Sequence, residues 1–72
     1  MSEIVDARGL SCPQPVLLTL SKLKQVDAGE IEVQVDNEVS RENVTRAARN
    51  QGWEIADIVA EKNEYRIVLR RG

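Results

Sequence analysis

The sequence predicts an α+β fold, a two-layer α/β sandwich in which a mixed four-stranded sheet has two helices on one face. First, strand and helix patterns follow one another in the order β-α-β-α-β-β. Second, the two helical connections permit parallel pairing, whereas the last two strands are joined by a short turn and must pair antiparallel. Third, the strands alternate apolar and polar residues, so one face of the sheet meets solvent and both helices lie on the other.

Length, composition and charge limit the class of protein. The 72 residues suffice for one domain, residues 1–72, and 42% hydrophobic with 31% charged residues is typical of a globular chain. The formal net charge of −2 does not favour direct binding to nucleic acid. No apolar run approaches the ~20 residues of a membrane span, and Met1–Glu3 has no signal-like character. We therefore expect a cytoplasmic monomer with no membrane partner, and the single cysteine suits a reducing compartment.

The first strand is expected at Glu3–Ala7, with Ile4 and Val5 both covered by neighbouring elements. The loop Arg8–Ser11 follows and leads to the only cysteine of the chain. Gly9 allows the backbone to turn within this loop, because glycine tolerates conformations that other residues avoid.

The first helix pattern starts directly after Cys12, and two prolines mark its beginning. Because proline is tolerated in the first turn of a helix, the helix begins either at Pro13, with Cys12 as its N-cap, or only at Pro15. In both cases the thiol lies within about one turn of the amino end. That end carries the equivalent of about half a positive charge, which favours an anion and lowers the pKa of a thiol. A reactive Cys12 and a small buried hydrophobic Cys12 are both open at this point.

Apolar residues in the first helix recur at spacings of three and four, which predicts one buried face. The central stripe comprises Val16, Leu20 and Leu23, and its flanks are Leu17 and Val26. Leu18 falls outside this stripe and projects from the polar side, one turn beyond Gln14. A turn at residues 27–29 ends the helix with a glycine.

The second helix is expected to begin at Ser40 as N-cap, with a hydrophobic staple between Val39 and Val44. The face toward the sheet comprises Val44, Ala47, Ala48 and Gln51, and the opposite side comprises Arg41, Thr45, Arg46 and Arg49. Small alanine side chains allow the helix to lie close to a sheet. Gly52 ends the helix in a left-handed conformation.

The remaining strands have different patterns. Glu30–Asp36 alternates strictly. Its buried face comprises Ile31, Val33 and Val35. In Trp53–Glu61 the alternation slips around residues 57–59, which indicates a β-bulge. Residues 62–64 form a turn, and Tyr65–Arg70 alternates again, so the last two strands form an antiparallel hairpin.

The residue content excludes several chemistries. The chain has no histidine and a single cysteine, so it cannot contain a cysteine–histidine pair of the hydrolase kind. An intrachain zinc site lacks ligands, and a dithiol oxidoreductase lacks its resolving cysteine. No cofactor and no metal are indicated. What remains is a lone thiol that forms a covalent intermediate with another protein, which is typical of a carrier rather than of an autonomous enzyme.

The segment Asp6–Val16, with the sequence DARGLSCPQPV, resembles the signature of the TusA/SirA/YedF-like sulfur-carrier family. The Cys-Pro-x-Pro core at Cys12–Pro15 and the preceding Gly9-Leu10 are specific features, and the resemblance extends over nearly the whole chain. Val35–Glu38 and Glu42–Arg46 are most similar to the amino-terminal domain of YedF-type proteins. Such proteins often have a second, larger domain, so this chain is either a free-standing paralogue or a part of a longer protein. The family's fold, a two-layer sandwich with a mixed four-stranded sheet, agrees with the order of elements.

The resemblance implies sulfurtransferase-like relay through a persulfide on Cys12. The donor is a cysteine desulfurase or a rhodanese-like protein, and the acceptor is a further protein. Destinations in the family include tRNA thiolation, molybdenum cofactor assembly and sulfur oxidation, and YedF-like members are also linked to selenium metabolism; the residues do not select among them. The motif positions expected to support the cysteine are Asp6, Arg8, Gly9, Leu10, Pro13 and Pro15.

Other features have competing interpretations. Arg41, Arg46, Arg49, Arg66, Arg70 and Arg71 form either a basic patch for RNA or an acidic partner, or ordinary solvated charge. Composition favours solvated charge. For Trp53 we favour a place in the core or at its rim over a docking role. Asp6 is expected to orient the loop or Arg8 rather than to transfer protons.

Gln14 and Leu18 are candidate contacts for a protein partner, because an exposed apolar residue near a reactive thiol can anchor docking. Single exposed leucines are also common on protein surfaces, so the interpretation that Leu18 has no binding role stays open. The alternative function, of a different class, is a regulatory or RNA-binding module without catalysis, in which Cys12 is structural.

Overall fold

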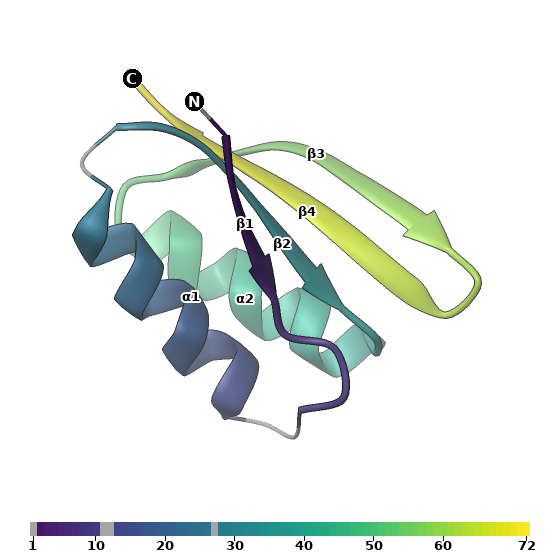
Figure 1. Ribbon diagram of the computed structural model, residues 1–72. Coiled ribbons are helices and arrows are strands. Elements are labelled where there is room, and N and C mark those ends of the chain that lie inside the picture. The colour runs from purple at the N-terminus through teal and green to yellow at the C-terminus, as the bar shows by residue number, and fades with distance from the viewer. Residues whose placement is uncertain (1, 11–12, 27) are drawn as a thin grey trace.

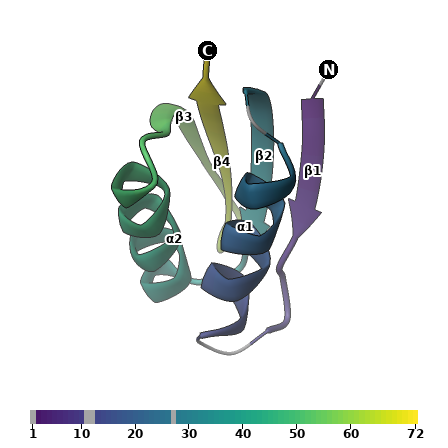
Figure 2. The same cartoon turned by 90° about the vertical axis from the view of Figure 1, so that its left-hand side faces the viewer.

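The structure is a computed structural model that describes residues 2–10, 13–26 and 28–72. The elements in this part of the chain are β1 (Ser2–Asp6), α1 (Gln14–Gln25), β2 (Gly29–Val35), α2 (Glu38–Asn50), β3 (Glu54–Glu61) and β4 (Glu64–Arg71). They form one sheet in the order β1-β2-β4-β3, in which β1 runs parallel to β2 and the other neighbours are antiparallel. Both helices cover the same face of the sheet (Figures 1 and 2). The predicted α+β sandwich is therefore confirmed.

The core lies between the sheet and the two helices. The fully buried apolar side chains are Ala7, Ile31, Val33, Val35, Val44, Ala48, Ile67 and Leu69. Three of them alternate along β2, as predicted, because this strand is covered by helices on one face and by solvent on the other. Trp53 is also buried, so its side chain belongs to the core rather than to a docking surface.

Helix α1 begins at Gln14, between the two starts that the sequence allowed. Pro13 occupies the N-cap position, so neither alternative is met: the helix starts neither at Pro13 with Cys12 as N-cap nor at Pro15. Cys12 itself lies outside the described residues. Pro15 takes the place in the first turn where no backbone N–H is needed, and its ring is buried.

The buried face of α1 is rotated relative to the predicted stripe. Thr19 is fully buried and donates its hydroxyl to the backbone carbonyl of Pro15 at 2.8 Å, so this hydroxyl has a partner inside the core. Leu23 is buried as predicted, whereas Leu17 is 53% exposed and does not flank the core. Leu18 is 40% exposed, which confirms its place outside the buried stripe. A prediction based on the spacing of apolar residues cannot identify a buried threonine, because threonine is a polar residue type.

Helix α2 begins earlier than predicted: its first residue is Glu38, and its N-cap is Asn37, three residues before the predicted cap Ser40. The Asn37 Oδ1 accepts the backbone N–H of Ser40 at 2.7 Å, so Ser40 is the residue that is capped and not the cap. Val39 is 62% exposed, which contradicts the predicted staple with Val44. Thr45 is buried instead of solvent-facing, because its hydroxyl donates to the backbone carbonyl of Glu42 at 2.8 Å.

Of the predictions for the two edge strands, the one for β1 is wrong in part and the one for β3 is confirmed. On β1, Val5 is buried but Ile4 is 62% exposed, so the expectation that both are covered is wrong. Ile4 lies on the open face of the sheet, opposite Glu32 of β2. On β3 the register shifts between Ile55 and Asp57, which confirms the bulge. The turn into β4 consists of Lys62 and Asn63 at positive φ, the geometry of a two-residue hairpin.

Candidate functional site

The segment that leads to Cys12 leaves the sheet where β1 ends (Figure 1). Because β1 and β2 are parallel, their carboxyl ends meet at one edge, and this edge is where open α/β sheets usually present functional groups. Ser11 and Cys12 lie outside the described residues. The geometry of the candidate site is therefore that of its flanks, from Asp6 to Leu10 and from Pro13 onward.

Asp6 and Arg8 form a bidentate ion pair at the start of this segment. Arg8 Nε lies 2.9 Å from Asp6 Oδ1, and Arg8 Nη2 lies 3.0 Å from Asp6 Oδ2. The backbone N–H of Arg8 also donates to Asp6 Oδ1 at 3.1 Å. These hydrogen bonds lower the pKa of Asp6 to about 2 and raise the pKa of Arg8. Both side chains are exposed, so the pair orients the loop more than it stabilises the fold.

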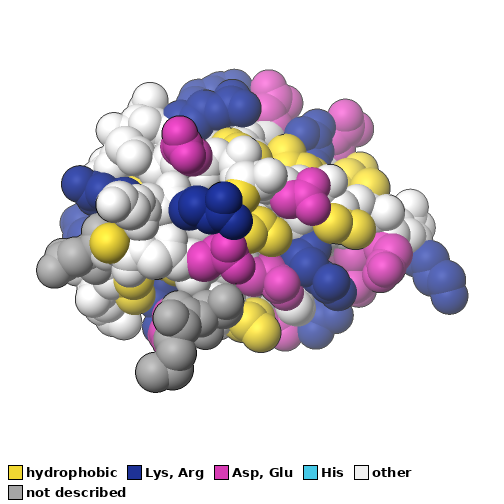
Figure 3. Space-filling model, turned by 90° about the horizontal axis from the view of Figure 1, so that it is seen from above, with side chains coloured by type: hydrophobic (Ala, Val, Ile, Leu, Met, Phe, Trp, Pro, Cys, Tyr) yellow, Lys and Arg dark blue, Asp and Glu magenta, His cyan; other side chains and the backbone are white. Residues whose placement is uncertain are grey.

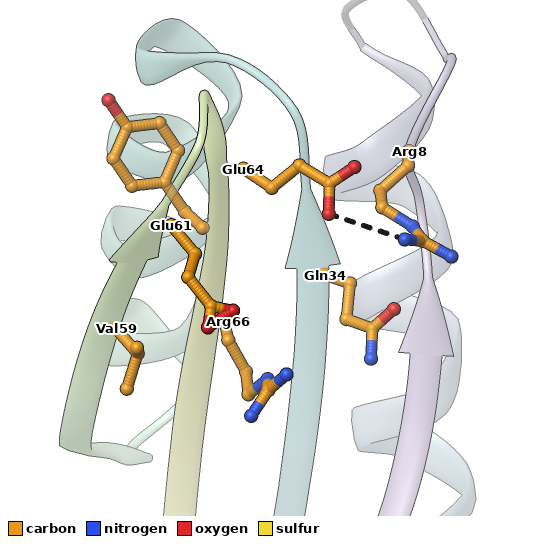
Figure 4. Close-up of a pocket in the computed structure, with 7 residues that line it drawn as sticks. Arg8, Gln34, Val59, Glu61, Glu64 and Arg66 are labelled. Carbon is orange, nitrogen blue, oxygen red and sulfur yellow. Dashed lines mark hydrogen bonds and ion pairs between the residues drawn. The ribbon is translucent and has the colours of Figure 1, made fainter.

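The guanidinium of Arg8 also contacts a residue that lies far from it in the sequence. Arg8 Nη1 lies 3.3 Å from Oε1 of Glu64, the first residue of β4 (Figure 4). The two residues border a small hollow that is otherwise lined by Gln34, Val59, Glu61, Tyr65 and Arg66. Two carboxylates balance the two guanidiniums there, so the hollow has no net preference for an anion.

Gly9 is anchored through its backbone. Its φ is +78°, in the left-handed region that glycine adopts without strain, which accounts for this residue type at this position. Its N–H donates to Asp36 Oδ2 at 2.7 Å, and the N–H of Ala7 donates to the carbonyl of Gln34 at 2.8 Å. Leu10 is partly buried against the core. The chain is thus held to the fold up to the residue before Ser11.

Two of these anchoring residues were missed from the sequence. Glu64 gave no signal, because it lies far along the chain in an ordinary hairpin. For Asp36 the sequence did contain a usable signal. It is a polar residue directly after a buried strand, and this strand, β2, runs parallel to the strand that leads to the cysteine. Carboxyl ends of adjacent parallel strands lie close together, so its meeting with the loop could have been proposed.

On the other side of Cys12, the first turns of α1 expose a partly apolar surface. Gln14 and Pro13 are exposed, as are Leu17 and Leu18. A shallow groove between β1 and α1 is lined by Ile4, Val5, Asp6, Leu18, Ser21, Lys22 and Gln25. Lys22, one of these residues, forms an ion pair with Glu3 at 2.9 Å. The two predicted contact residues are therefore accessible to a partner.

Among the described residues, four of the six candidate arginines are paired with carboxylates rather than gathered into a free basic patch. The ion pairs on α2 and on the open face of the sheet are Arg41–Glu38, Arg46–Glu42, Arg66–Glu32 and Arg70–Glu30. Figure 3 shows basic and acidic side chains interspersed on the face seen from above. Arg41 also lies over the ring of Tyr65, 5.4 Å from its centroid. This pairing is the pattern of ordinary solvated charge that composition favoured.

The part of the chain that the structure describes contains neither a cluster of metal-binding side chains nor a membrane-spanning helix. No three carboxylates there are grouped as metal ligands would be. Neither described helix has the length and apolar character needed to cross a membrane. The fold and the sequence together define a small α/β sandwich in which the chain's single cysteine stands between β1 and the first helix in the sequence.

Comparison with known proteins agrees with this class. The model of the family described as "Sulfurtransferase TusA" matches residues 3–71. A protein of Archaeoglobus fulgidus is 35% identical over 69 residues, which cover 94% of this chain and 94% of that protein. YedF of Escherichia coli K12 is 34% identical over 68 residues, which cover 93% of this chain and 88% of YedF. Both proteins have the name "putative sulfur carrier protein".

The fold has a close structural counterpart. The crystal structure of a SirA-like protein from Desulfitobacterium hafniense aligns with a TM-score of 0.88 and 27% sequence identity. The alignment covers 100% of this chain and 99% of that one. The chain belongs to the TusA family, and the resemblance seen in the Cys-Pro-x-Pro segment is confirmed.

Proposed function

We propose that this protein is a sulfur carrier that holds sulfur as a persulfide on Cys12. The observation that carries the proposal is the Cys-Pro-x-Pro segment within a chain that matches the TusA family over residues 3–71. The start of α1 within this segment, two residues after Cys12, supports it, because the amino end of a helix favours a thiolate over a thiol. The first turn of α1 contains no acidic residue to oppose that effect.

The proposed reaction is an exchange at sulfur without net oxidation. The Cys12 thiol loses its proton to solvent, and the thiolate attacks the outer sulfur of a persulfide on the donor protein. A bond forms between the Cys12 Sγ and that sulfur, while the bond to the donor's cysteine breaks and the donor leaves as a thiolate. In the second step a nucleophile of the acceptor takes the outer sulfur, and Cys12 leaves as a thiolate. The cycle needs no oxidant, and both partners are proteins.

We infer that the partners dock on the exposed first turns of α1. Gln14 and Leu18 lie within two turns of the position that follows Cys12, and both are accessible. An apolar side chain at the centre of a contact contributes much of the binding free energy, whereas the surrounding charged pairs contribute little. The motif positions Asp6, Arg8, Gly9 and Leu10 support the cysteine from the other side. We further propose that residues 1–72 act as one unit, as a cytoplasmic monomer.

Intact mass after incubation with a cysteine desulfurase and cysteine tests the proposal. Wild-type protein is expected to gain the mass of one sulfur atom, which a reductant removes, and Cys12→Ser is expected to gain none. Labelled sulfur supplied as cysteine and followed to the carrier provides an independent readout. A wild-type protein that never gains sulfur from either a desulfurase or a rhodanese-like donor would contradict the proposed function.

A further inference from the structure

Three hydrogen-bonded anchors hold the segment that leads to Cys12. The N–H of Ala7 continues the sheet by donating to the carbonyl of Gln34. The side chain of Arg8 bonds to carboxylates on β1 and β4, but these groups are exposed and such pairs contribute little. The N–H of Gly9 donates to the Asp36 carboxylate at 2.7 Å, a short charge-assisted hydrogen bond of the stronger kind. This anchor is the one closest to Cys12 in sequence.

The Asp36 carboxylate joins this segment to the second helix. Its Oδ2 accepts the Gly9 N–H, and its Oδ1 accepts Nδ2 of Asn37 at 3.2 Å. Asn37 is the N-cap of α2 and accepts the backbone N–H of Ser40 at 2.7 Å. The hydrogen bonds therefore run in series from the cysteine segment to the first turn of α2. Because Asn37 is fixed by its capping bond, it fixes the orientation of the carboxylate as well.

We propose that Asp36 is a positioning residue for sulfur transfer, and that it sets the approach of Cys12 to the donor persulfide by holding Gly9. The inference rests on the proposed function. Exchange at sulfur requires the attacking and leaving sulfurs to lie in line, and a displacement of about 1 Å can cost as much as a hundredfold in rate. A small alkylating reagent has no such requirement, since it approaches an accessible thiolate from many directions.

Three substitutions of Asp36 separate positioning from charge. Asp36→Ala removes the acceptor, Asp36→Glu keeps the charge but moves it by one methylene, and Asp36→Asn keeps an acceptor oxygen while losing the charge. We expect kcat/KM for transfer from a cysteine desulfurase to fall about tenfold in the first two variants and by less than about twofold in Asp36→Asn. Alkylation of Cys12 by iodoacetamide is expected to be unchanged. The matched control is Glu42→Ala, which removes an exposed carboxylate from α2 that bonds to Arg46 and not to the loop.

Amide exchange at Gly9 tests the anchor independently of sulfur transfer. The N–H of Gly9 is expected to exchange much faster in Asp36→Ala and Asp36→Glu, and only slightly faster in Asp36→Asn, whose neutral acceptor makes a weaker hydrogen bond. Wild-type transfer in Asp36→Ala, or equal transfer rates in Asp36→Asn and Asp36→Glu, would overturn the positioning role. The second comparison decides the matter even if Asp36→Ala does not fold. If wild-type protein takes up no sulfur at all, the proposed function fails and the positioning role with it, while Gly9 exchange still establishes whether Asp36 anchors the loop.

Discussion

The guanidinium of Arg8 bonds to Glu64 across 56 residues of sequence, from the loop after β1 to the first residue of β4. The same group is held by Asp6 through two parallel N–H···O bonds of 2.9 and 3.0 Å. Arg8 therefore lies between two carboxylates, and its direction is set by both. Since all three side chains are exposed, the arrangement controls orientation more than stability.

The first prediction concerns the titration of Asp6. Hydrogen bonds from Arg8 lower its pKa from 3.8 to about 2. A carboxyl with a lowered pKa in the folded state adds stability that is fully present above its unfolded pKa, and that is lost as the pH falls through the folded value. Its contribution is thus present above pH 3.8 and disappears toward pH 2. Arg8→Gln is expected to return the Asp6 titration, followed by NMR of the carboxyl carbon, toward 3.8.

Arg66→Gln is the matched control for that titration, because it removes one guanidinium that pairs with Glu32 and not with Asp6. It should leave the Asp6 midpoint unchanged. An Asp6 that titrates near 3.8 in wild-type protein would show that the bidentate pair does not persist in solution.

The second prediction is that Cys12→Ser keeps the fold and cannot be loaded with sulfur. Because Pro13 is the N-cap of α1, the fold does not depend on a capping side chain at position 12. A hydroxyl lacks the nucleophilicity of a thiolate, so transfer is lost while the melting temperature stays near that of wild type. Thermal melting and sulfur labelling measure the two properties separately. Unfolding of this variant at room temperature would favour the alternative in which Cys12 is structural.

The third prediction is that Leu18→Glu slows sulfur transfer with little change in melting temperature. Leu18 is 40% exposed on α1, so a charge there meets solvent in the free protein but would be buried in a complex. Transfer rates at several donor concentrations should show the effect mainly in KM. The control is Leu23→Ala, which truncates a buried residue of the same helix and should cost ~2–5 kcal/mol of stability. A low melting temperature for Leu18→Glu would place Leu18 in the core.

The fourth prediction compares two glycines that both have φ in the left-handed region. Gly9 and Gly52 have φ values of +78° and +84°, and a Cβ at either position meets no atom within 4 Å. Alanine is therefore expected to cost ~1–2 kcal/mol at both positions through backbone strain alone. For a domain of this size, each kcal/mol lowers the melting temperature by ~4–8 °C. Only Gly9→Ala should also slow sulfur transfer, and equal transfer rates in the two variants would contradict a role for Gly9 beyond the fold.

The fifth prediction concerns the acidity of the Cys12 thiol. We expect its pKa to lie below that of free cysteine, because α1 begins at Gln14 and its first turn contains no acidic residue. The shift should be modest, since an exposed helix end contributes only ~0.3–1 kcal/mol. The rate of alkylation against pH measures the midpoint. A midpoint above that of free cysteine, with slow alkylation at every pH, would indicate a buried thiol and weaken the carrier proposal.

The fold was predictable because its signals are local. Strict alternation in Glu30–Asp36 follows from a strand with one covered face, and it predicted the three buried residues of β2. The slip near Asp57 predicted the bulge, and the short turn before Tyr65 predicted the hairpin. Each of these patterns depends on neighbours within a few residues, where backbone geometry and side-chain period are tightly coupled.

The starts of the helices and the limits of the core depended on more distant contacts. Ser40 is a good capping residue, but Asn37 comes where the chain leaves β2, and it caps α2 first. Thr19 is polar by type, yet it is buried because its hydroxyl bonds within its own helix. Ile4 is apolar by type, yet it is exposed because β1 is an edge strand with solvent on one face. Residue type alone does not decide burial in such cases.

The sequence by itself indicated which family the chain belongs to and which residue, Cys12, we propose to react. With one cysteine and no histidine, the chemistry of the site reduces to a single thiol in a specific motif. Only the tertiary structure decided which residues anchor the segment that leads to that thiol. Gly9 meets Asp36 and Arg8 meets Glu64 because parallel pairing of β1 with β2 and the return of β4 bring three separate segments to one edge. Contacts of this kind leave no period in the sequence, since they join residues that are neighbours only after the sheet has formed.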